Sequence, residues 1–139
     1  MPRGLITFWT VVAALCLAGC GQLDKSELST QVESLQSLAQ EGTVLAHGIV
    51  EGSAHSAFVR VHAEEMATSA SDVADQLSGQ QVPADLEADV RQTKELAKRV
   101  SDELEELSHH PDDREKARSI EAALKAQASQ MESLRGGSQ

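Results

Sequence analysis

The chain has 139 residues and a formal net charge of −10 at pH 7, and only 2% of its residues are aromatic. Such an acidic chain lacks the basic patch that nucleic-acid phosphates require, so nucleic-acid binding is not expected. Broad contact with anionic lipid head groups is disfavoured for the same reason. The acidity is uneven, because residues 20–82 contain nine carboxylates but only Lys25 and Arg60 as bases.

The first element along the chain is a short apolar segment. Arg3 precedes residues 5–17, which are almost entirely apolar, and the small residues Ala18 and Gly19 follow. A basic start, an apolar core and small residues before a cleavage site are the features of a secretory signal peptide. The segment is shorter than the roughly 20 residues that a transmembrane helix needs. We therefore expect residues 1–19 to be a signal peptide and the protein to be exported.

The predicted cleavage site carries a more specific motif. Leu17-Ala18-Gly19-Cys20 resembles the lipobox of bacterial lipoproteins. The resemblance implies that diacylglycerol is attached to the Cys20 thiol and that the chain is cleaved before Cys20. The lipid then anchors the protein to a membrane, where it faces the periplasm or the cell exterior. Because Cys16 leaves with the signal peptide and Cys20 is blocked, no intramolecular disulfide is expected.

Four segments with helical periodicity follow, and the first starts near Asp24. Asp24 can cap the helix, and Glu27 would complete a capping box. The apolar positions are three and four residues apart: Leu28, Val32, Leu35, Ala39, Ala46 and Ile49, widened by Leu38 and Leu45. Gly42 and Gly48 interrupt this stripe and indicate either a close helix approach or a bend. Residues 51–53 are expected to form a turn.

The second segment runs from about residue 54 to residue 78. The third begins at Pro83, because proline is favoured at the first helical position, and residues 109–111 break it. The fourth starts at Pro111 and closes at residues 136–137. The predicted core stripes of these three segments are Val59, Ala63, Met66, Ala70, Val73 and Leu77; Leu86, Val90, Thr93, Ala97, Val100, Leu104 and Leu107; and Ala117, Ile120, Leu124, Gln127, Met131 and Leu134.

Four amphipathic helices joined by short turns predict an all-α fold, an up-down four-helix bundle. The alternative is a pair of helical hairpins that completes its core by self-association. The expected organisation is a signal peptide at residues 1–19, a lipidated N-terminus and short tether at 20–25, the helical bundle at 26–135 and a flexible tail at 136–139.

Several histidines raise the question of a metal site. His55 and His62 are seven residues apart on one helix face, Glu65 lies three residues further on, and His47 could approach them across a helical hairpin. Neutral imidazoles together with a carboxylate suit zinc or copper. The alternative is that His62 flanks the core with one hydrogen bond while His47 faces solvent.

A second polar cluster contains Glu106, His109, His110, Asp112 and Asp113. Glu106 and His109 have the Glu-x-x-His spacing of di-iron bundles, but such a site needs the motif on two helices. The cluster also lies at a helix end beside a proline. We therefore interpret it as a solvated turn whose charges complement the helix ends.

Residues 57–63 contain the one aromatic residue outside the signal segment, Phe58, together with the isolated Arg60. One interpretation is a partner-binding site in which Phe58 is the apolar anchor and Arg60 contacts an anion. In the other, Phe58 packs in the core and Arg60 forms an exposed ion pair with Glu64.

The sequence contains no nucleophile elbow and no glycine-rich phosphate loop, so we expect no enzymatic activity. Beyond the lipobox, the chain resembles small helical bacterial lipoproteins of unassigned role. The predicted function is non-enzymatic binding or scaffolding at the cell envelope, with an envelope protein as partner and self-association as a further option. The alternative is an extracytoplasmic zinc- or copper-binding protein that uses His47, His55 and His62.

Overall fold

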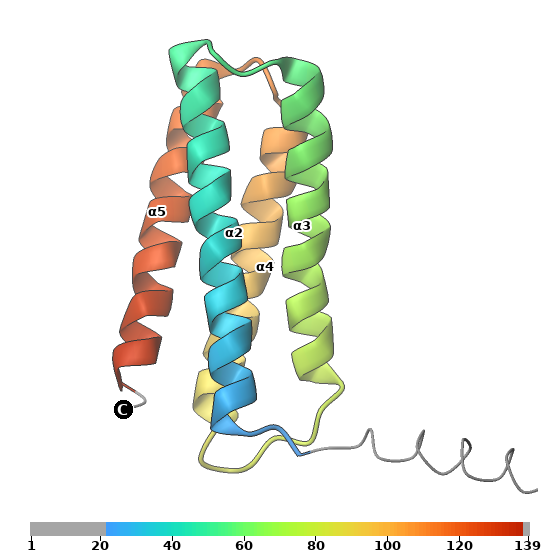
Figure 1. Ribbon diagram of the computed structural model, residues 1–139, viewed down its shortest axis with the longest axis vertical. Helices are drawn as coiled ribbons and strands as arrows, with labels where there is room; N and C mark the ends of the chain where they lie inside the picture. The colour runs from blue at the N-terminus through green and yellow to red at the C-terminus, as the bar shows by residue number, and fades with distance from the viewer. Residues whose placement is uncertain (1–21, 138–139) are drawn as a thin grey trace, which may run out of the picture.

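A computed structural model describes residues 22–137, which form a bundle of four antiparallel helices (Figure 1). The helices are α2 (Lys25–Glu51), α3 (Ser56–Ser78), α4 (Glu87–His109) and α5 (Arg114–Gly137). The predicted up-down four-helix bundle is confirmed. The start of α2, the α3–α4 loop and the end of α5 lie at one end, called here the proximal end, and the α2–α3 and α4–α5 turns form the distal end.

The predicted signal peptide, the lipidation residue Cys20 and the last two residues of the predicted tail lie outside the described residues. Within the part of the chain that the structure describes, no helix is both long and apolar enough to cross a membrane.

Each helix buries most of the apolar stripe that its sequence predicts, although the predicted Leu38 and Leu134 are only half-buried. The buried residues of α2, α3 and α4 recur every three or four positions, and α5 buries Ala117, Ile120, Leu124, Gln127 and Met131. Two further leucines, Leu23 and Leu96, were not predicted to be in the core but are 1% and 2% exposed. Leu23 therefore belongs to the bundle, not to a tether.

The proximal end is closed by contacts between the start of the chain and the α3–α4 loop. Gln22 and Gln81 form an isolated parallel β-bridge, and the Leu23 N–H donates to the Gln81 carbonyl at 3.1 Å. Asp24 caps α2 as predicted, accepting from the Glu27 N–H at 2.8 Å. The Glu27 carboxylate, however, accepts from Gln80 Nε2 at 2.6 Å across the loop instead of closing a capping box.

Two predicted helix starts were wrong. Residues 83–86 form a turn in which the Leu86 N–H donates to the Pro83 carbonyl at 2.9 Å, because the loop first pairs with the start of the chain, and α4 begins only at Glu87. The last helix begins at Arg114 because Asp113 caps it, accepting from two backbone N–H groups of its first turn at 3.1 and 3.0 Å.

The four helices are not equally spaced. α2 packs most closely on α5 and α3 on α4, while α2 and α4 also contact each other across the bundle. No Cα atom of α3 lies within 8 Å of one in α5, so the cross-section is a rhombus. Of the neighbouring helices, α2 and α3 pack most loosely. One chain thus completes its own core, and the alternative of self-associating hairpins is not the arrangement adopted.

Gly42 marks the close approach at the centre of this rhombus. A Cβ atom at Gly42 would lie 2.6 Å from Leu104 Cδ2 of α4 and 2.9 Å from Leu124 Cδ1 of α5. Of the two alternatives for this glycine, the structure shows the close approach, since α2 continues through it without a break. The absent side chain is what lets α2 and α4 meet across the bundle.

Substituting Gly42→Leu should force these helices apart. We expect the free energy of unfolding to fall by about 1–3 kcal/mol, the usual cost of overpacking a core, as measured by urea denaturation. Gly136→Leu is the matched control, because nothing lies within 4 Å of a Cβ atom there. Equal effects of the two substitutions would contradict the close approach.

Gln127 is the polar residue in the core stripe of α5. It is 7% exposed, and its Oε1 has no hydrogen-bond partner among the described residues. Because an unpaired buried oxygen is destabilising, we expect Gln127→Met to raise the free energy of unfolding by about 1 kcal/mol. The exposed Gln130 of the same helix provides the control, Gln130→Met, for which thermal melting should show little change. A lower melting temperature for Gln127→Met would show that the amide makes a favourable interaction.

Candidate binding groove

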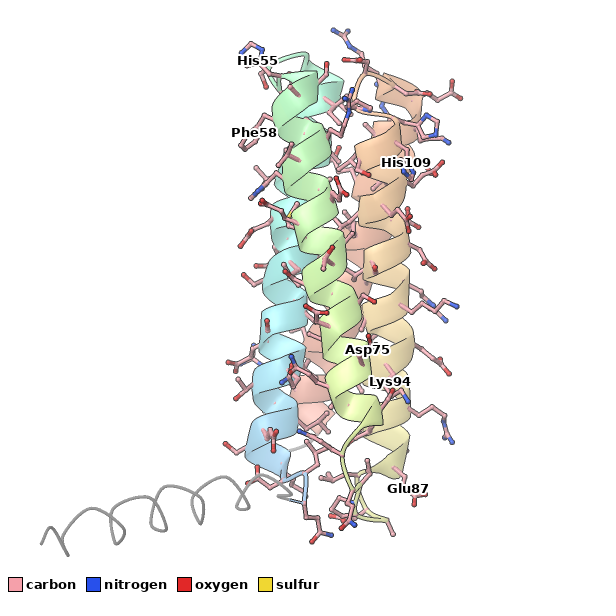
Figure 2. The ribbon with its side chains drawn as sticks, turned by 90° about the vertical axis from the view of Figure 1, so that its right-hand side faces the viewer. His55, Phe58, Asp75, Glu87, Lys94 and His109 are labelled. Carbon is pink, nitrogen blue, oxygen red and sulfur yellow. The ribbon has the colours of Figure 1, made fainter. Side chains whose placement is uncertain are left out.

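An open groove lies between α2 and α3 near the distal end. It has a volume of about 570 Å³ and is called here the distal groove. Its lining comes from α2, the α2–α3 turn and the first two turns of α3: Gln40, Glu41, Val44, Leu45, Gly48, Ser53, Ala54, His55, Phe58 and His62. Figure 2 shows His55 and Phe58 at the distal end, on the side of α3 that is turned away from α4. The groove therefore opens on the loosest seam of the bundle.

Large apolar side chains are exposed in and beside the distal groove. Val44 is 73% exposed, Phe58 59% and Val61 56%, and these are the exposed large hydrophobic residues of the described chain. All three lie in the distal halves of α2 and α3. The interpretation that Phe58 packs in the core is therefore wrong. Instead, its ring stacks on the imidazole of His62, with centroids 5.2 Å apart and planes at 21°.

Helix geometry explains why Phe58 is outside the core. Val59 is fully buried, and successive helical residues are about 100° apart, so Phe58 and His62 share the neighbouring face. His55 is the N-cap residue of α3, but its side chain makes no capping hydrogen bond and lines the groove instead. Three side chains spaced by three and four residues thus form one wall of the groove.

The α2–α3 seam is held together by polar contacts only near the proximal end. There Gln31 Nε2 of α2 donates to Gln76 Oε1 of α3 at 3.1 Å. From this pair to the α2–α3 turn, no hydrogen bond or ion pair among residues 22–137 joins the two helices. The distal half of the seam thus lacks polar links, and the open groove there has a mostly apolar surface.

The candidate metal ligands are only partly brought together. His62 Nδ1 lies 3.8 Å from Glu65 Oε2, and His55 shares the groove with His62. His47 instead faces α5, where its Nδ1 lies 3.4 Å from Glu121 Oε1. In residues 22–137 no group of three or more His, Cys, Asp or Glu is placed to hold a metal. A zinc or copper site stays a prediction.

The His47–Glu121 contact belongs to the α2–α5 interface. The hydrogen bond donated by Lys125 is the largest cause that lowers the pKa of Glu121, and the nearby His47 adds to it. Further along the same interface, Arg135 Nη2 lies 2.7 Å from Glu33 Oε1. These pairs link α2 to α5, whereas the α2–α3 seam has no such ion pair among the described residues.

The second polar cluster closes the distal end beside the groove. Glu106 accepts a hydrogen bond from Lys116 of α5, which is the largest cause that lowers its pKa, and His110 Nε2 lies 3.5 Å from Glu106 Oε1. Asp112 accepts from the Ser56 hydroxyl at the start of α3, and Asp113 caps α5. His109 is the last residue of α4. The cluster is thus a polar turn at helix ends, as predicted.

The structure separates the two residues of the predicted partner site. Phe58 lines the distal groove, whereas Arg60 lines a groove between α3 and α4 together with Glu64. Neither of the described residues Arg60 and Glu64 forms an ion pair. The sequence interpretation missed Val44, although a valine outside the α2 stripe was a signal for an exposed apolar surface.

Comparison with known proteins gives no assignment. No protein-family profile, no curated protein and no solved structure matches the chain.

Proposed function

We propose that the chain is a lipid-anchored protein of the cell envelope that binds a protein partner in its distal groove and has no enzymatic role. The anchoring part rests on the resemblance of Leu17-Ala18-Gly19-Cys20 to a lipobox. The observation that carries the binding part is the exposure of Val44 and Phe58 in the lining of one open groove. Apolar patches that soluble surfaces leave uncovered commonly mark interaction sites.

The position of the groove relative to Cys20 supports this role. Leu23 is buried at the proximal end, so only Gly21 and Gln22 separate Cys20 from the bundle core. α2 then rises about 1.5 Å per residue, which places Gln40 to Gly48 roughly 20–35 Å from its start. A protein anchored at Cys20 would hold the groove away from the lipid surface, where a second protein can reach it.

The shape of the groove favours a protein partner over a small ligand. Small-molecule sites usually enclose most of the ligand surface, whereas the distal groove is a trough between two helices that is open to solvent. A single phenylalanine, already stacked on His62, provides its aromatic surface. Side chains presented by another protein can cover such a trough without being enclosed.

The anchor is tested by metabolic labelling with radioactive palmitate. We expect the wild-type chain to incorporate label and to fractionate with membranes, and Cys20→Ser to do neither, because the serine hydroxyl does not take the place of the thiol. Cys16→Ser is the matched control and should retain the label. Label that persists in Cys20→Ser would contradict the lipobox assignment.

The groove is tested by site-specific photo-crosslinking in cells. A photoreactive amino acid at Val44, which is 73% exposed, should give a discrete crosslinked product. The same amino acid at Ser119, exposed on α5 at a similar height, should not. We expect the product to disappear when Phe58→Ala is added, because truncating a central apolar anchor typically weakens binding about tenfold or more. Equal crosslinking from Val44 and Ser119 would contradict binding in the groove.

A further inference from the structure

The distal groove is long enough to bind one short helix. Its walls are α2 and α3, and along α2 it extends from Gln40 to Gly48, about 12 Å at 1.5 Å per residue. That length matches two turns of a third helix laid into the seam. A helix in such a groove makes contact through apolar side chains at positions i, i+3 or i+4, and i+7. Val44, Leu45 and Phe58 offer the apolar surface for them.

The charged side chains in and beside the lining are mainly acidic; the exception is Arg114 of α5, whose guanidinium lies against Gly52, next to the lining residue Ser53. Glu41 lines it, and Glu65 lies beside the lining residue His62. None of its lining residues is a lysine or an arginine. The two bases of residues 20–82 are elsewhere, Lys25 at the proximal start of α2 and Arg60 on the α3–α4 side. The groove therefore combines a mainly apolar lining with two carboxylates, Glu41 in the lining and Glu65 next to it.

These observations also decide between a second copy of the chain and a different protein. The full sequence has a formal net charge of −10, so two copies of this acidic chain would repel each other. A segment that carries lysine or arginine beside its apolar stripe would instead be attracted to the acidic chain. Complementary charges of this kind favour fast and specific association more than they add affinity.

We infer that the occupant of the distal groove is a cationic amphipathic helix of a partner protein, whose apolar stripe covers Val44 and Phe58 while its lysines or arginines face Glu41 and Glu65. This inference rests on the proposed function and names the chemistry of its partner. The open, unbridged distal half of the α2–α3 seam is the place where that helix packs.

Defined peptides test the inference. The probe is a helical peptide of about two to five turns with leucines at i, i+4 and i+7 flanked by lysines, and its counterpart carries glutamates in place of the lysines. Both are titrated against the ¹⁵N-labelled chain of residues 20–139 with Cys20→Ser, which contains all four helices. We expect the lysine peptide to shift the amide signals of Val44, Phe58 and His62, and the glutamate peptide to bind at least about tenfold more weakly.

Matched variants separate the groove from general attraction to an acidic protein. Phe58→Ala should weaken the lysine peptide about tenfold, and its melting curve checks that the bundle stays folded. Glu41→Gln with Glu65→Gln should weaken it about threefold and reduce the salt dependence, since exposed pairs contribute little each. Glu115→Gln with Glu132→Gln removes the same charge from exposed positions of α5 and should leave the affinity for the lysine peptide and its salt dependence unchanged.

The inference is overturned if neither peptide binds, if the glutamate peptide binds as well as the lysine peptide, or if the α5 variant loses as much affinity as the groove variant. These outcomes are distinct from failure of the proposed function. If a partner crosslinks to Val44 through a segment that has no basic residues, the inferred cationic helix is wrong, whereas the proposed function still stands. No crosslinked product from Val44 in the otherwise wild-type chain, or palmitate label in Cys20→Ser, would instead count against the proposed function.

Discussion

The arrangement of the bundle depends on the contact between α2 and α4 at Gly42. Leu104 and Leu124 occupy the space that a side chain at this position would need. Because protein interiors are packed without large voids, a side chain at this position would push α2 away from α4 along the short diagonal of the rhombus. α3 and α5 are then held apart, and each packs mainly on one partner, α3 on α4 and α5 on α2.

The distal groove is a consequence of this unequal packing. With α2 drawn toward α5 and α3 toward α4, the seam between α2 and α3 is left as the loosest side of the bundle. Gln31 and Gln76 bridge it near the proximal end, and ion pairs such as Arg135–Glu33 are found on the opposite side of α2. The distal half keeps its apolar surface exposed, which costs solubility unless a partner covers it.

The two ends of the molecule have different roles in the proposed function. At the proximal end, Leu23 is part of the core and its N–H is bonded to Gln81, which ties the start of the chain to the α3–α4 loop. An anchor at Cys20 would therefore be close to the bundle and would restrain its orientation. Val44 and Phe58 are at the distal end, so in the proposed function an anchor at Cys20 would not compete with a partner for the groove.

The apolar pattern of the sequence predicted four helices and most of their buried faces, but not the starts of α4 and α5 or the burial of Leu23 and Leu96. The period of its apolar residues is a local property, and it predicted even the burial of Gln127 between Leu124 and Met131. The sequence singled out Phe58 but did not predict whether it is buried or exposed. Phe58 is next to the core residue Val59 on α3, and a side chain in that position is covered only if the neighbouring helix packs close to it. The distance between α2 and α3 is set by long-range packing among all four helices, and local patterns do not encode it. Tertiary packing therefore accounts for three features: the exposure of Phe58, the open groove in the distal seam, and the contact of His47 with Glu121 instead of His62.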